Sequence, residues 1–349
     1  MWPMTRPMMR RPFSALALAS VVCAASPAAW AQASAAAGDG AAQAREVRAW
    51  LLRIHEAARH RNFQGTFVVS GGGAVSSSRI AHFCDGTNQF ERIESLDGQA
   101  RHVLRHNDVV HTVWPGSRVV QVEQRDLVMS FPALLQAGDD RIVDFYDVQP
   151  QGSDRVAGHE ANVLWVKPKD AYRFGYRLWA DKASGLLLRA DVLGAKSELL
   201  ETSAFSDVAI GVKAQPETVV AAMKKLDGYR VLRPTLTPTR MEAEGWALRE
   251  TAPGFRQVSC VKRPMDGSGP QDKDDGAPQV LQTIFSDGLT YVSVFIEPFN
   301  PQRHVRAVLV SVGATQTFMQ RQGDWWITVV GDVPPATLRL FANGLERRK

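Results

Sequence analysis

The sequence predicts an α+β protein: a large antiparallel sheet with one helix to cover it, followed by a smaller mixed α/β domain. Two observations carry this prediction. Short runs of alternating apolar and polar residues follow one another, and turn-forming residues rather than helices separate them, which is typical of an antiparallel meander. The chain also has 349 residues, 45% of them hydrophobic, which suffices for two domains of ~100–200 residues with buried cores.

Residues 1–31 are predicted to be a secretory signal peptide. Three arginines and no acidic residue flank an apolar run from Phe13 to Ala25, and Ala29-Trp30-Ala31 has the small-residue pattern of a signal peptidase site. The apolar run is shorter than the ~20 residues that a membrane-spanning helix needs. Lipid attachment at Cys23 is the alternative, but the residues before it are too bulky for that processing. We therefore expect a soluble, exported mature chain.

The large domain is predicted to cover residues 45–212, after a flexible lead at 32–44. From Glu46 to Arg61 apolar residues recur at three- and four-residue steps, which predicts an amphipathic helix. Strands are expected at 65–70, 79–84, 89–94, 100–105, 109–114, 118–123, 142–148, 161–167, 172–180, 186–193 and 199–208. A turn or a single helical piece is expected at Phe131 to Leu135. A sheet of this size must either close on itself or leave an apolar concavity.

A linker at 213–239 and a smaller domain at 240–349 complete the chain. The linker is expected to hold a short helix at 215–226 and an extended part in which Pro234 and Pro238 suppress helix. The small domain is expected to hold a strand at 255–262, a loop at 264–278, a hairpin of 280–285 and 290–296, two more strands and a helix at 336–345. Ser286-Asp287-Gly288 is the turn of the hairpin, and Asp332 is expected to cap the last helix.

No motif in the sequence encodes a catalytic centre, a metal site or a cofactor site. His55 and His60 are five residues apart, so on a helix their rings diverge by ~140°, whereas a zinc-protease helix needs a spacing of four; we expect both to face solvent. His82, His102 and His106 share a predicted hairpin region, but no cysteine or carboxylate pairing fixes a metal geometry. We predict a protein that is not an enzyme.

Charge and cysteine content exclude two further classes. The formal charge is +5, but removing residues 1–31 takes away three arginines and no acid, which leaves +2. Basic residues elsewhere are interspersed with acidic ones, apart from the run Arg347-Arg348-Lys349, so nucleic-acid binding is not expected. Cys84 and Cys260 are expected to be free thiols, although an oxidising compartment would permit a disulfide between them.

Several short runs occur in order over nearly the whole mature chain. They are Gly65-Thr66-Phe67-Val68, Glu94-Ser95-Leu96-Asp97-Gly98, Tyr176-Arg177-Leu178-Trp179, Ser184-Gly185-Leu186-Leu187-Leu188-Arg189, Pro253-Gly254-Phe255, Phe285-Ser286-Asp287-Gly288-Leu289, Val292-Ser293-Val294-Phe295-Ile296-Glu297 and Val329-Val330-Gly331-Asp332-Val333-Pro334. Together they resemble the MucB/RseB family of periplasmic negative regulators of the envelope-stress sigma factor. The chain departs from the family pattern at Val69, where an aromatic residue is expected, and at Val312-Gly313-Ala314 with Phe318, which replace a Met-Gly-Ala and Tyr pattern.

The resemblance implies that the large domain is a half-open β-barrel like those of periplasmic lipoprotein carriers. It also implies a periplasmic protein that binds the periplasmic segment of a transmembrane anti-sigma factor and shields that segment from regulated proteolysis. Release is then expected when lipid or lipopolysaccharide fragments bind. A periplasmic carrier of lipids or lipoproteins is the alternative function, and the sequence leaves a homo-oligomer open.

Candidate binding residues follow from these expectations. On the concave face of the large sheet we expect Trp50, Ile54 and Phe67 to accept acyl chains, each buried CH₂ contributing about 0.8 kcal/mol. The linker at Pro234 to Pro238 would then carry a hinge.

Partner binding is expected on the small domain, around Asp287 and Gly288 in the hairpin turn and around Trp325 and Trp326. On a strand the two tryptophan rings point to opposite faces, so one of them can meet a partner, and core packing of both is the alternative. An edge strand there could take an added peptide strand.

Overall fold

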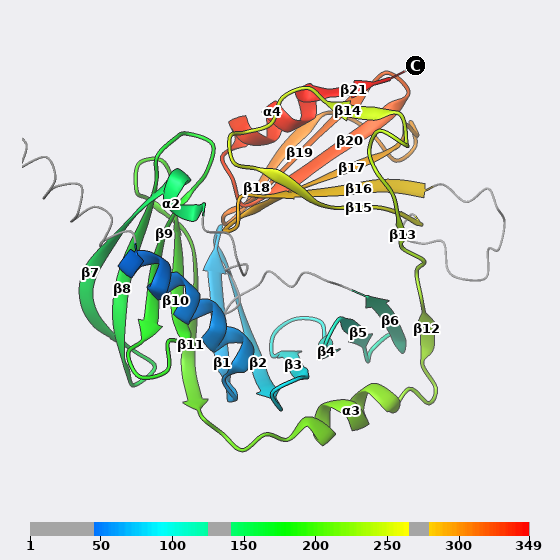
Figure 1. Cartoon of the computed structure of the whole chain (residues 1–349). Helices are drawn as coiled ribbons and strands as arrows, with labels where there is room; N and C mark the ends of the chain where they lie inside the picture. Colours follow the sequence, from blue (N-terminus) through cyan, green and yellow to red (C-terminus); the bar gives the residue numbers. More distant parts are fainter. Residues whose placement is uncertain (1–44, 125–140, 265–278, 349) are drawn as a thin grey trace, which may run out of the picture. The chain divides into compact units, whose positions relative to one another are not determined.

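The computed structural model describes residues 45–124, 141–264 and 279–348. Within these ranges the chain forms a twelve-stranded sheet, a seven-stranded sheet and a two-stranded sheet, with few helices (Figure 1). The predicted signal peptide, the flexible lead, the piece at Phe131 to Leu135 and most of the loop at 264–278 lie outside the described residues. No helix of the described part is long and apolar enough to cross a membrane.

The large sheet is a meander that follows a helix over residues 45–60. Its strands are β1 (Phe63–Gly71), β2 (Ala74–Cys84), β3 (Gln89–Ser95), β4 (His102–His106), β5 (Val109–Trp114), β6 (Val119–Gln124), β7 (Tyr146–Val156), β8 (His159–Pro168), β9 (Gly175–Asp181), β10 (Leu187–Leu193), β11 (Leu199–Ile210) and β12 (Arg230–Leu232). The spatial order is β12-β6-β5-β4-β3-β2-β1-β11-β10-β9-β8-β7. Strand β12 pairs parallel with β6 and the other pairs are antiparallel.

The small sheet is built mainly from hairpins. Its strands are β13 (Thr237–Pro238), β15 (Arg256–Pro264), β16 (Gln279–Ser286), β17 (Tyr291–Pro298), β18 (Val308–Val312), β19 (Thr315–Gln322) and β20 (Trp325–Gly331), in the order β13-β15-β16-β17-β20-β19-β18. Helix α4 (Pro335–Gly344) contacts β17, β19 and β20. The short strands β14 (Trp246–Leu248) and β21 (Leu345–Arg347) pair with each other.

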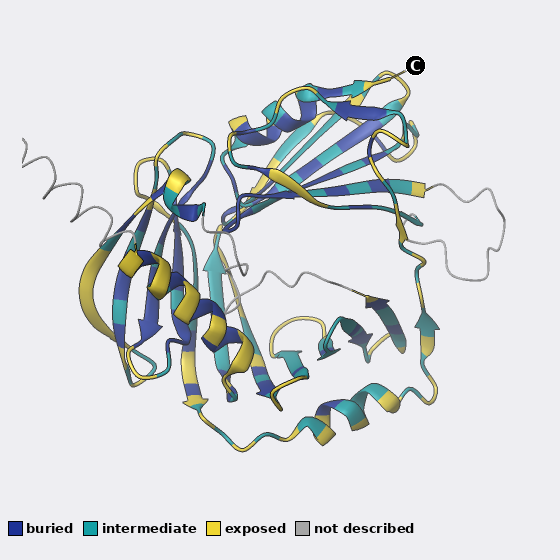
Figure 2. Ribbon diagram, viewed as in Figure 1, coloured by how far each residue is buried: buried dark blue, intermediate teal, exposed yellow. Residues whose placement is uncertain are grey.

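The two helices that accompany the large sheet cover different parts of it. The helix over 45–60 buries Val47, Leu51 and Ile54 in one cluster with strand residues such as Leu178, while Leu52 on its outer side is exposed. Figure 2 shows this helix with an exposed outer side. Helix α3 (Pro216–Lys224) contacts β3 and β4 and buries Val219 in a separate cluster.

The alternation of side chains along β5 shows which of its residues face α3 and which face away from it. Val113 packs with Val219 of α3 in the same cluster, so Val113 points to the α3 side. Its neighbours Thr112 and Trp114 point to the opposite side, because successive side chains of a strand alternate between the two faces. In the described residues, α3 therefore does not cover that opposite face of β3 to β6.

The predicted fold class is confirmed: a large, open, mainly antiparallel sheet with a covering helix precedes a smaller sheet with a terminal helix. Strands β7 and β12 end the large sheet in the described residues, so it is not a closed barrel. The segment predicted as a linker, 213–239, contains α3, β12 and β13.

Several local predictions were wrong. Residues Ile142–Phe145 form the helical turn α2, and the strand begins only at Tyr146. Three strands rather than two lie between the small-domain hairpin and the terminal helix. His55 is buried instead of facing solvent.

Asp332 does not cap α4, because the N-cap residue is Pro334 without a side-chain hydrogen bond. The Asp332 carboxylate instead accepts a hydrogen bond from the Thr315 hydroxyl at 2.6 Å. The helix starts at Pro335, so Asp332 lies two residues before the capping position and is free to bind the neighbouring strand.

Candidate functional site

Part of the large sheet that no described helix covers opens into a cavity of about 880 Å³ that also reaches the small sheet. This volume lies within the ~300–1,000 Å³ of small-molecule sites. Large-sheet residues in its wall are Phe67, Val69, Ser76, Ser78, Glu91, Ile93, Arg101, Val103, Arg105, Val110, Thr112, Trp114, Gln121, Glu123, Tyr176, Ala190, Val192, Glu201 and Ser203. Leu232 and, from the small domain, Arg263, Leu289, Thr290, Tyr291 and Asp332 complete it.

The register of the sheet explains why these side chains converge. Val69 of β1 lies opposite Ser203 of β11 and Ser76 of β2, and directly opposed residues in an antiparallel pair point to the same face. All three line the cavity. Phe63 lies six residues before Val69 on the same face of β1 and is buried in the cluster that contains Ile54. One end of this face is thus packed with the helix over 45–60, and the other end is left open.

The cavity wall is amphipathic. Apolar side chains such as Phe67 and Val103 share it with charged side chains of both signs, which are Arg101, Arg105, Arg263, Glu91, Glu123, Glu201 and Asp332. A molecule that combines an apolar chain with a charged or polar group matches such a wall better than a purely apolar one, because each buried polar group needs a partner.

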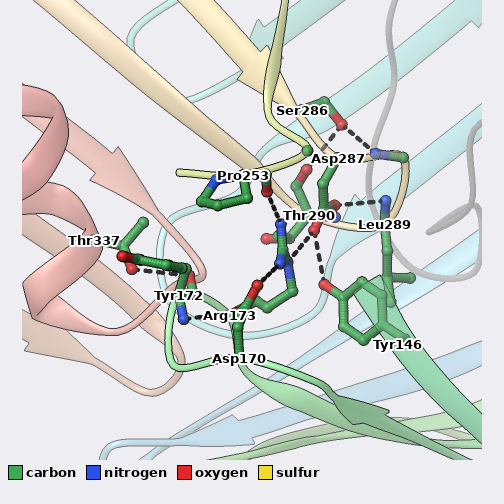
Figure 3. A network of polar contacts seen from close by, with 12 residues as sticks. Tyr146, Asp170, Tyr172, Arg173, Pro253, Ser286, Asp287, Leu289, Thr290 and Thr337 are labelled. Carbon is green, nitrogen blue, oxygen red and sulfur yellow. Dashed lines mark hydrogen bonds and ion pairs between the residues drawn. The ribbon is translucent and has the colours of Figure 1, made fainter. Parts of the chain in front are cut away.

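A buried ion pair joins the two sheets beside the cavity (Figure 3). The guanidinium of Arg173, in the loop before β9, donates from Nε to Oδ2 of Asp287 at 2.8 Å, and both side chains are completely buried. Arg173 also donates to the carboxylate of Asp170 and to the carbonyl of Pro253. The hydroxyl of Tyr146 donates to the same Asp287 oxygen at 2.9 Å. Burial raises the pKa of Tyr146 well above its usual value, and the neighbouring Asp287 charge raises it further.

The turn between β16 and β17 presents Asp287 in this position. Oδ1 of Asp287 accepts hydrogen bonds from the backbone amides of Leu289 at 3.0 Å and Thr290 at 2.9 Å. The hydroxyl of Ser286 donates to the Thr290 carbonyl at 2.8 Å and accepts from the Gly288 amide at 3.0 Å. Gly288 has a φ of 98°, a conformation that favours glycine. The Asp287 carboxylate therefore stabilises its own turn through Oδ1 and binds Arg173 of the large domain through Oδ2.

Aromatic rings and backbone from both sides enclose the arginine. The Arg173 guanidinium carbon lies 4.7 Å from the ring centre of Phe145 and 5.2 Å from that of Phe255, which is within cation–π range. Gly254 has a φ of 85°, and a Cβ there would lie 2.5 Å from the Phe145 ring. Nearby, the hydroxyl of Thr337 in α4 donates to the Tyr172 carbonyl at 2.8 Å.

A second tie between the sheets lies at the hairpin loops. The backbone amide of Ala314 donates to Oε2 of Glu201 at 3.3 Å. A Cβ on Gly313 would lie 2.5 Å from that carboxylate oxygen, and one on Gly72 would lie 2.6 Å from the Gly313 nitrogen. The Gly71-Gly72-Gly73 turn of the large sheet thus permits a close backbone approach to the β18–β19 turn.

Two acids of this region carry raised pKa values. Burial raises the pKa of Glu201, the hydrogen bond from Ala314 opposes the shift, and the Asp332 charge adds to it. Burial also raises the pKa of Asp332, against the hydrogen bond from Thr315. The pKa of Tyr291 is raised by burial and by the charges of both acids.

A third tie crosses the far side of the cavity. The guanidinium of Arg263 in β15 lies 4.0 Å from the carboxylate of Glu123 in β6. Gln121 donates to the same carboxylate at 2.5 Å. This pair is longer than the Arg173–Asp287 bond, and the Arg263 side chain retains 21% exposure.

The three residues predicted to accept acyl chains are not gathered at one place. Phe67 lines the cavity, whereas Ile54 is 1% exposed within the core and Trp50 packs against that core from the helix. Their role in lipid binding stays a prediction.

The four residues predicted to bind a partner also lie apart. Asp287 and Gly288 are buried in the turn, while Trp325 packs edge-on against Trp246 and Trp326 stacks on His304 at 4.7 Å. The expected edge strand at these residues was wrong, because β20 lies between β17 and β19, and β16 and β17 are also internal. The edges of the small sheet in the described residues are β13 and β18. Partner binding by these four residues stays a prediction.

The cysteines and histidines form no metal cluster in the described part of the chain. Cys84 and Cys260 are free thiols in different sheets. The ring of His82 stacks on Phe63 at 5.2 Å and lies 3.1 Å from the Arg59 carbonyl, so it belongs to the packing between β2 and the helix.

Sequence reasoning missed the residues that tie the sheets together. Arg173 lies within a segment predicted as strand, and Glu201 reads as one polar position in an alternating run. The only available signal was the run Ser286-Asp287-Gly288, which identified the turn but not the charge that it faces.

An open antiparallel sheet that keeps a cavity on one face and is bridged by a second sheet is the architecture of a ligand- or partner-binding protein. Comparison with known proteins shows to which family of binding proteins the chain belongs. The MucB/RseB N-terminal domain model matches residues 46–223, and the MucB/RseB C-terminal domain model matches residues 240–346. The chain belongs to the MucB/RseB family.

Individual relatives agree with this assignment. The sigma factor AlgU regulatory protein MucB of Pseudomonas aeruginosa is 30% identical over 318 residues, which cover 88% of this chain and 92% of that protein. The sigma-E factor regulatory protein RseB of Escherichia coli K12 is 25% identical over 300 residues, 85% of this chain and 90% of that protein. A crystal structure of MucB in complex with MucA(peri) superposes with a TM-score of 0.64 at 26% identity, and covers 86% of this chain and 99% of that one.

Removal of Arg173 is expected to be costly. Arg173→Met leaves the Asp287 carboxylate buried without its counter-charge, which costs about 3–5 kcal/mol of the free energy of unfolding. The matched control is Arg79→Ala, because Arg79 is 64% exposed and 3.9 Å from Glu94; exposed pairs are worth about 0–1 kcal/mol. Urea denaturation of both variants measures the two costs. Equal costs would contradict the central role of the buried pair.

Stability is expected to depend on pH through Glu201. Its pKa is higher in the folded than in the unfolded state, so folding takes up protons between the two values and stability falls as pH rises through the folded pKa. Glutamine does not titrate, so the free energy of unfolding of Glu201→Gln should increase relative to that of the native chain as the pH is raised from 4.5 to 7.5. Urea midpoints across this range test it, with the exposed Glu160→Gln as the control. A Glu201→Gln difference that does not change with pH would refute the assignment.

Proposed function

We propose that this chain is a periplasmic regulator that binds the periplasmic segment of a transmembrane anti-sigma factor. Binding shields that segment from regulated proteolysis and so keeps the envelope-stress sigma factor inactive. The observation that carries the proposal is the similarity, over 86% of this chain, to MucB, which has been crystallised in complex with MucA(peri). A signal peptide at residues 1–31 accounts for export, and the chain acts by binding rather than by catalysis.

The cavity supports a role for lipid or lipopolysaccharide fragments as the release signal. Phe67 and Val69 offer an apolar wall for acyl chains, and Arg101 and Arg105 offer cations to a phosphate-bearing head group. Because the cavity is walled by both sheets, an occupant contacts the large domain and the small domain together. Occupancy can thereby favour an arrangement of lower affinity for the anti-sigma segment, with the linker at Pro234 to Pro238 as the hinge.

We place the partner on the small sheet. Asp287, Gly288, Trp325 and Trp326 remain candidates, but the internal position of β20 directs peptide addition to the edge strand β18 of the same sheet. Val310 and Val312 of β18 are 43% and 59% exposed, and an exposed apolar edge is a template for an added strand.

A carrier of lipids or lipoproteins is the alternative that the cavity favours. A carrier hands its cargo on, so it would transfer lipid between membranes and leave cleavage of the anti-sigma segment unchanged. A regulator would do the reverse. One set of assays with the same purified protein therefore separates the two functions.

Protease protection tests the regulatory function. At saturating concentrations the protein is expected to slow cleavage of the anti-sigma periplasmic segment by its site-1 protease at least about tenfold, which corresponds to ~1.4 kcal/mol. Lipopolysaccharide should restore cleavage in the native chain. Restoration should need more lipopolysaccharide in Phe67→Ala, since a smaller apolar surface is buried. The matched control is Leu199→Ala, at an exposed position outside the cavity. If saturating lipopolysaccharide left the affinity for the segment unchanged, release by lipid would be wrong.

Charge on the edge strand tests the docking position. Val310→Lys should weaken binding of the anti-sigma segment at least about tenfold, because a lysine on an edge strand opposes strand addition. Val75→Lys is the control, since Val75 is 65% exposed on β2 of the large sheet. Isothermal titration calorimetry gives both affinities. Equal affinities would remove β18 from the interface without affecting the protection assay.

A further inference from the structure

Outside the cavity, the thiol of Cys84 lies beside a histidine that also contacts a glutamate. Sγ of Cys84, at the end of β2, is 3.7 Å from Nδ1 of His60. Nε2 of the same imidazole is 3.2 Å from Oε2 of Glu56, one turn earlier on the helix over 45–60. The imidazole therefore bridges a thiol and a carboxylate, which is the arrangement that activates a nucleophile when a base is oriented by a third group.

Neighbouring contacts hold the thiol at the end of the helix. The backbone amide of Cys84 donates to the side-chain oxygen of Asn62 at 2.9 Å, and the Gly86 amide donates to Cys84 Sγ at 3.4 Å. The His60 and Glu56 side chains are 48% and 52% exposed, and Cys84 is half-buried. The group is thus fixed in place and open to small solutes.

The other described cysteine makes a natural contrast. Cys260 is buried in the small sheet, and its Sγ accepts a hydrogen bond from the Thr283 hydroxyl at 3.3 Å. Burial raises the pKa of the Cys260 thiol. A thiol of this kind is inert because the thiolate is the reactive form.

We propose that Cys84 is a modification site that exchanges with small anionic disulfides and becomes a mixed disulfide. With Nε2–H donating to Glu56, the Nδ1 lone pair faces the thiol and accepts its proton. The Cys84 thiolate attacks one sulfur of the disulfide, the new S–S bond forms as the old one breaks, and the departing thiolate takes the proton from His60. The small-molecule disulfide is the oxidant, and one free thiol is released per mixed disulfide formed.

The surroundings favour an anionic disulfide. A small hollow of about 220 Å³ shares His60 and Glu56 with the thiol group, and its wall includes Arg53 and Arg61. Arg53 donates to the carbonyls of Lys182 and Ala183. Cys84 does not line this hollow itself, and the two arginines outnumber the acid Glu56 in its wall. An excess of positive charge beside the thiol raises the local concentration of anions. Glutathione disulfide has the matching charge and cystamine has the opposite one.

The rate of disulfide exchange tests the proposal on the full chain. Glutathione disulfide is expected to modify Cys84 at pH 7, as located by peptide mass spectrometry, while Cys260 stays unmodified until the protein is denatured. An unassisted thiol is only a few per cent ionised at this pH, so His60→Ala should slow the reaction at least about fivefold, and Glu56→Gln should slow it by a smaller factor. Free imidazole should restore part of the rate lost in His60→Ala.

Matched controls separate chemistry from folding. His102→Ala removes another partly exposed histidine that lies beside a glutamate, and it should leave the rate unchanged. His60→Gln replaces His60→Ala if the latter loses its native circular dichroism. Native-like rates in both His60 variants, or equal rates at Cys84 and Cys260, would overturn the activation. Faster reaction with cystamine than with glutathione disulfide would overturn the anionic preference.

Discussion

The buried Arg173–Asp287 pair is the constraint on which the contact between the two sheets depends. Two charges removed from water are stable only when they are paired and their remaining donors and acceptors are satisfied. Here Arg173 also binds Asp170 and the Pro253 carbonyl, and Asp287 accepts from Tyr146 and from two amides of its own turn. Three of the segments that supply these groups are the turn between β16 and β17, the start of β7 and the loop before β9. If one of them moved away, a buried charge would lose a partner, so the pair holds the three segments in place together.

The cavity follows from the same constraint. Helix 45–60 and α3 cover parts of the large sheet. A third part faces the small sheet, which is bridged to it at three ties and buries Leu289 and Ala314 in the core cluster of the large sheet. Glu201 and Asp332 lie at one of these ties with raised pKa values, which means that the folded state holds their charges at a cost. Such a region, which is bridged, amphipathic and carries unfavourable charge, is easier to rearrange than a packed core. This suits a cavity whose occupancy is proposed to change the affinity for the anti-sigma segment.

The sequence predicts what is local and misses what is distant. Alternation with period two located most of the strands, because burial on one face imposes it residue by residue, and Ser286-Asp287-Gly288 identified its turn by backbone geometry alone. The partner of Asp287 lies 114 residues away at Arg173, and no periodicity encodes such a pairing. Asp332 failed as a helix cap because α4 begins at Pro335, which leaves Asp332 two residues before the N-cap. Its carboxylate binds instead the hydroxyl of Thr315 on a neighbouring strand. The resemblance to a family supplied the partner and the signal, but it did not indicate which of these polar residues are buried.

The relative strengths of the three ties indicate how an occupant of the cavity can influence a distant partner. Coupling between two ligands is reciprocal, and a tenfold mutual effect needs only about 1.4 kcal/mol. Breaking the Arg173–Asp287 pair would cost about 3–5 kcal/mol, which is more than such coupling requires. The Arg263–Glu123 contact is longer, at 4.0 Å, and the Arg263 side chain is 21% exposed although Glu123 is buried, so its loss is expected to cost less than loss of the fully buried pair. An occupant that pushes β15 away from β6 would therefore separate the sheets on the Arg263 side, while the buried pair stays intact and acts as the pivot.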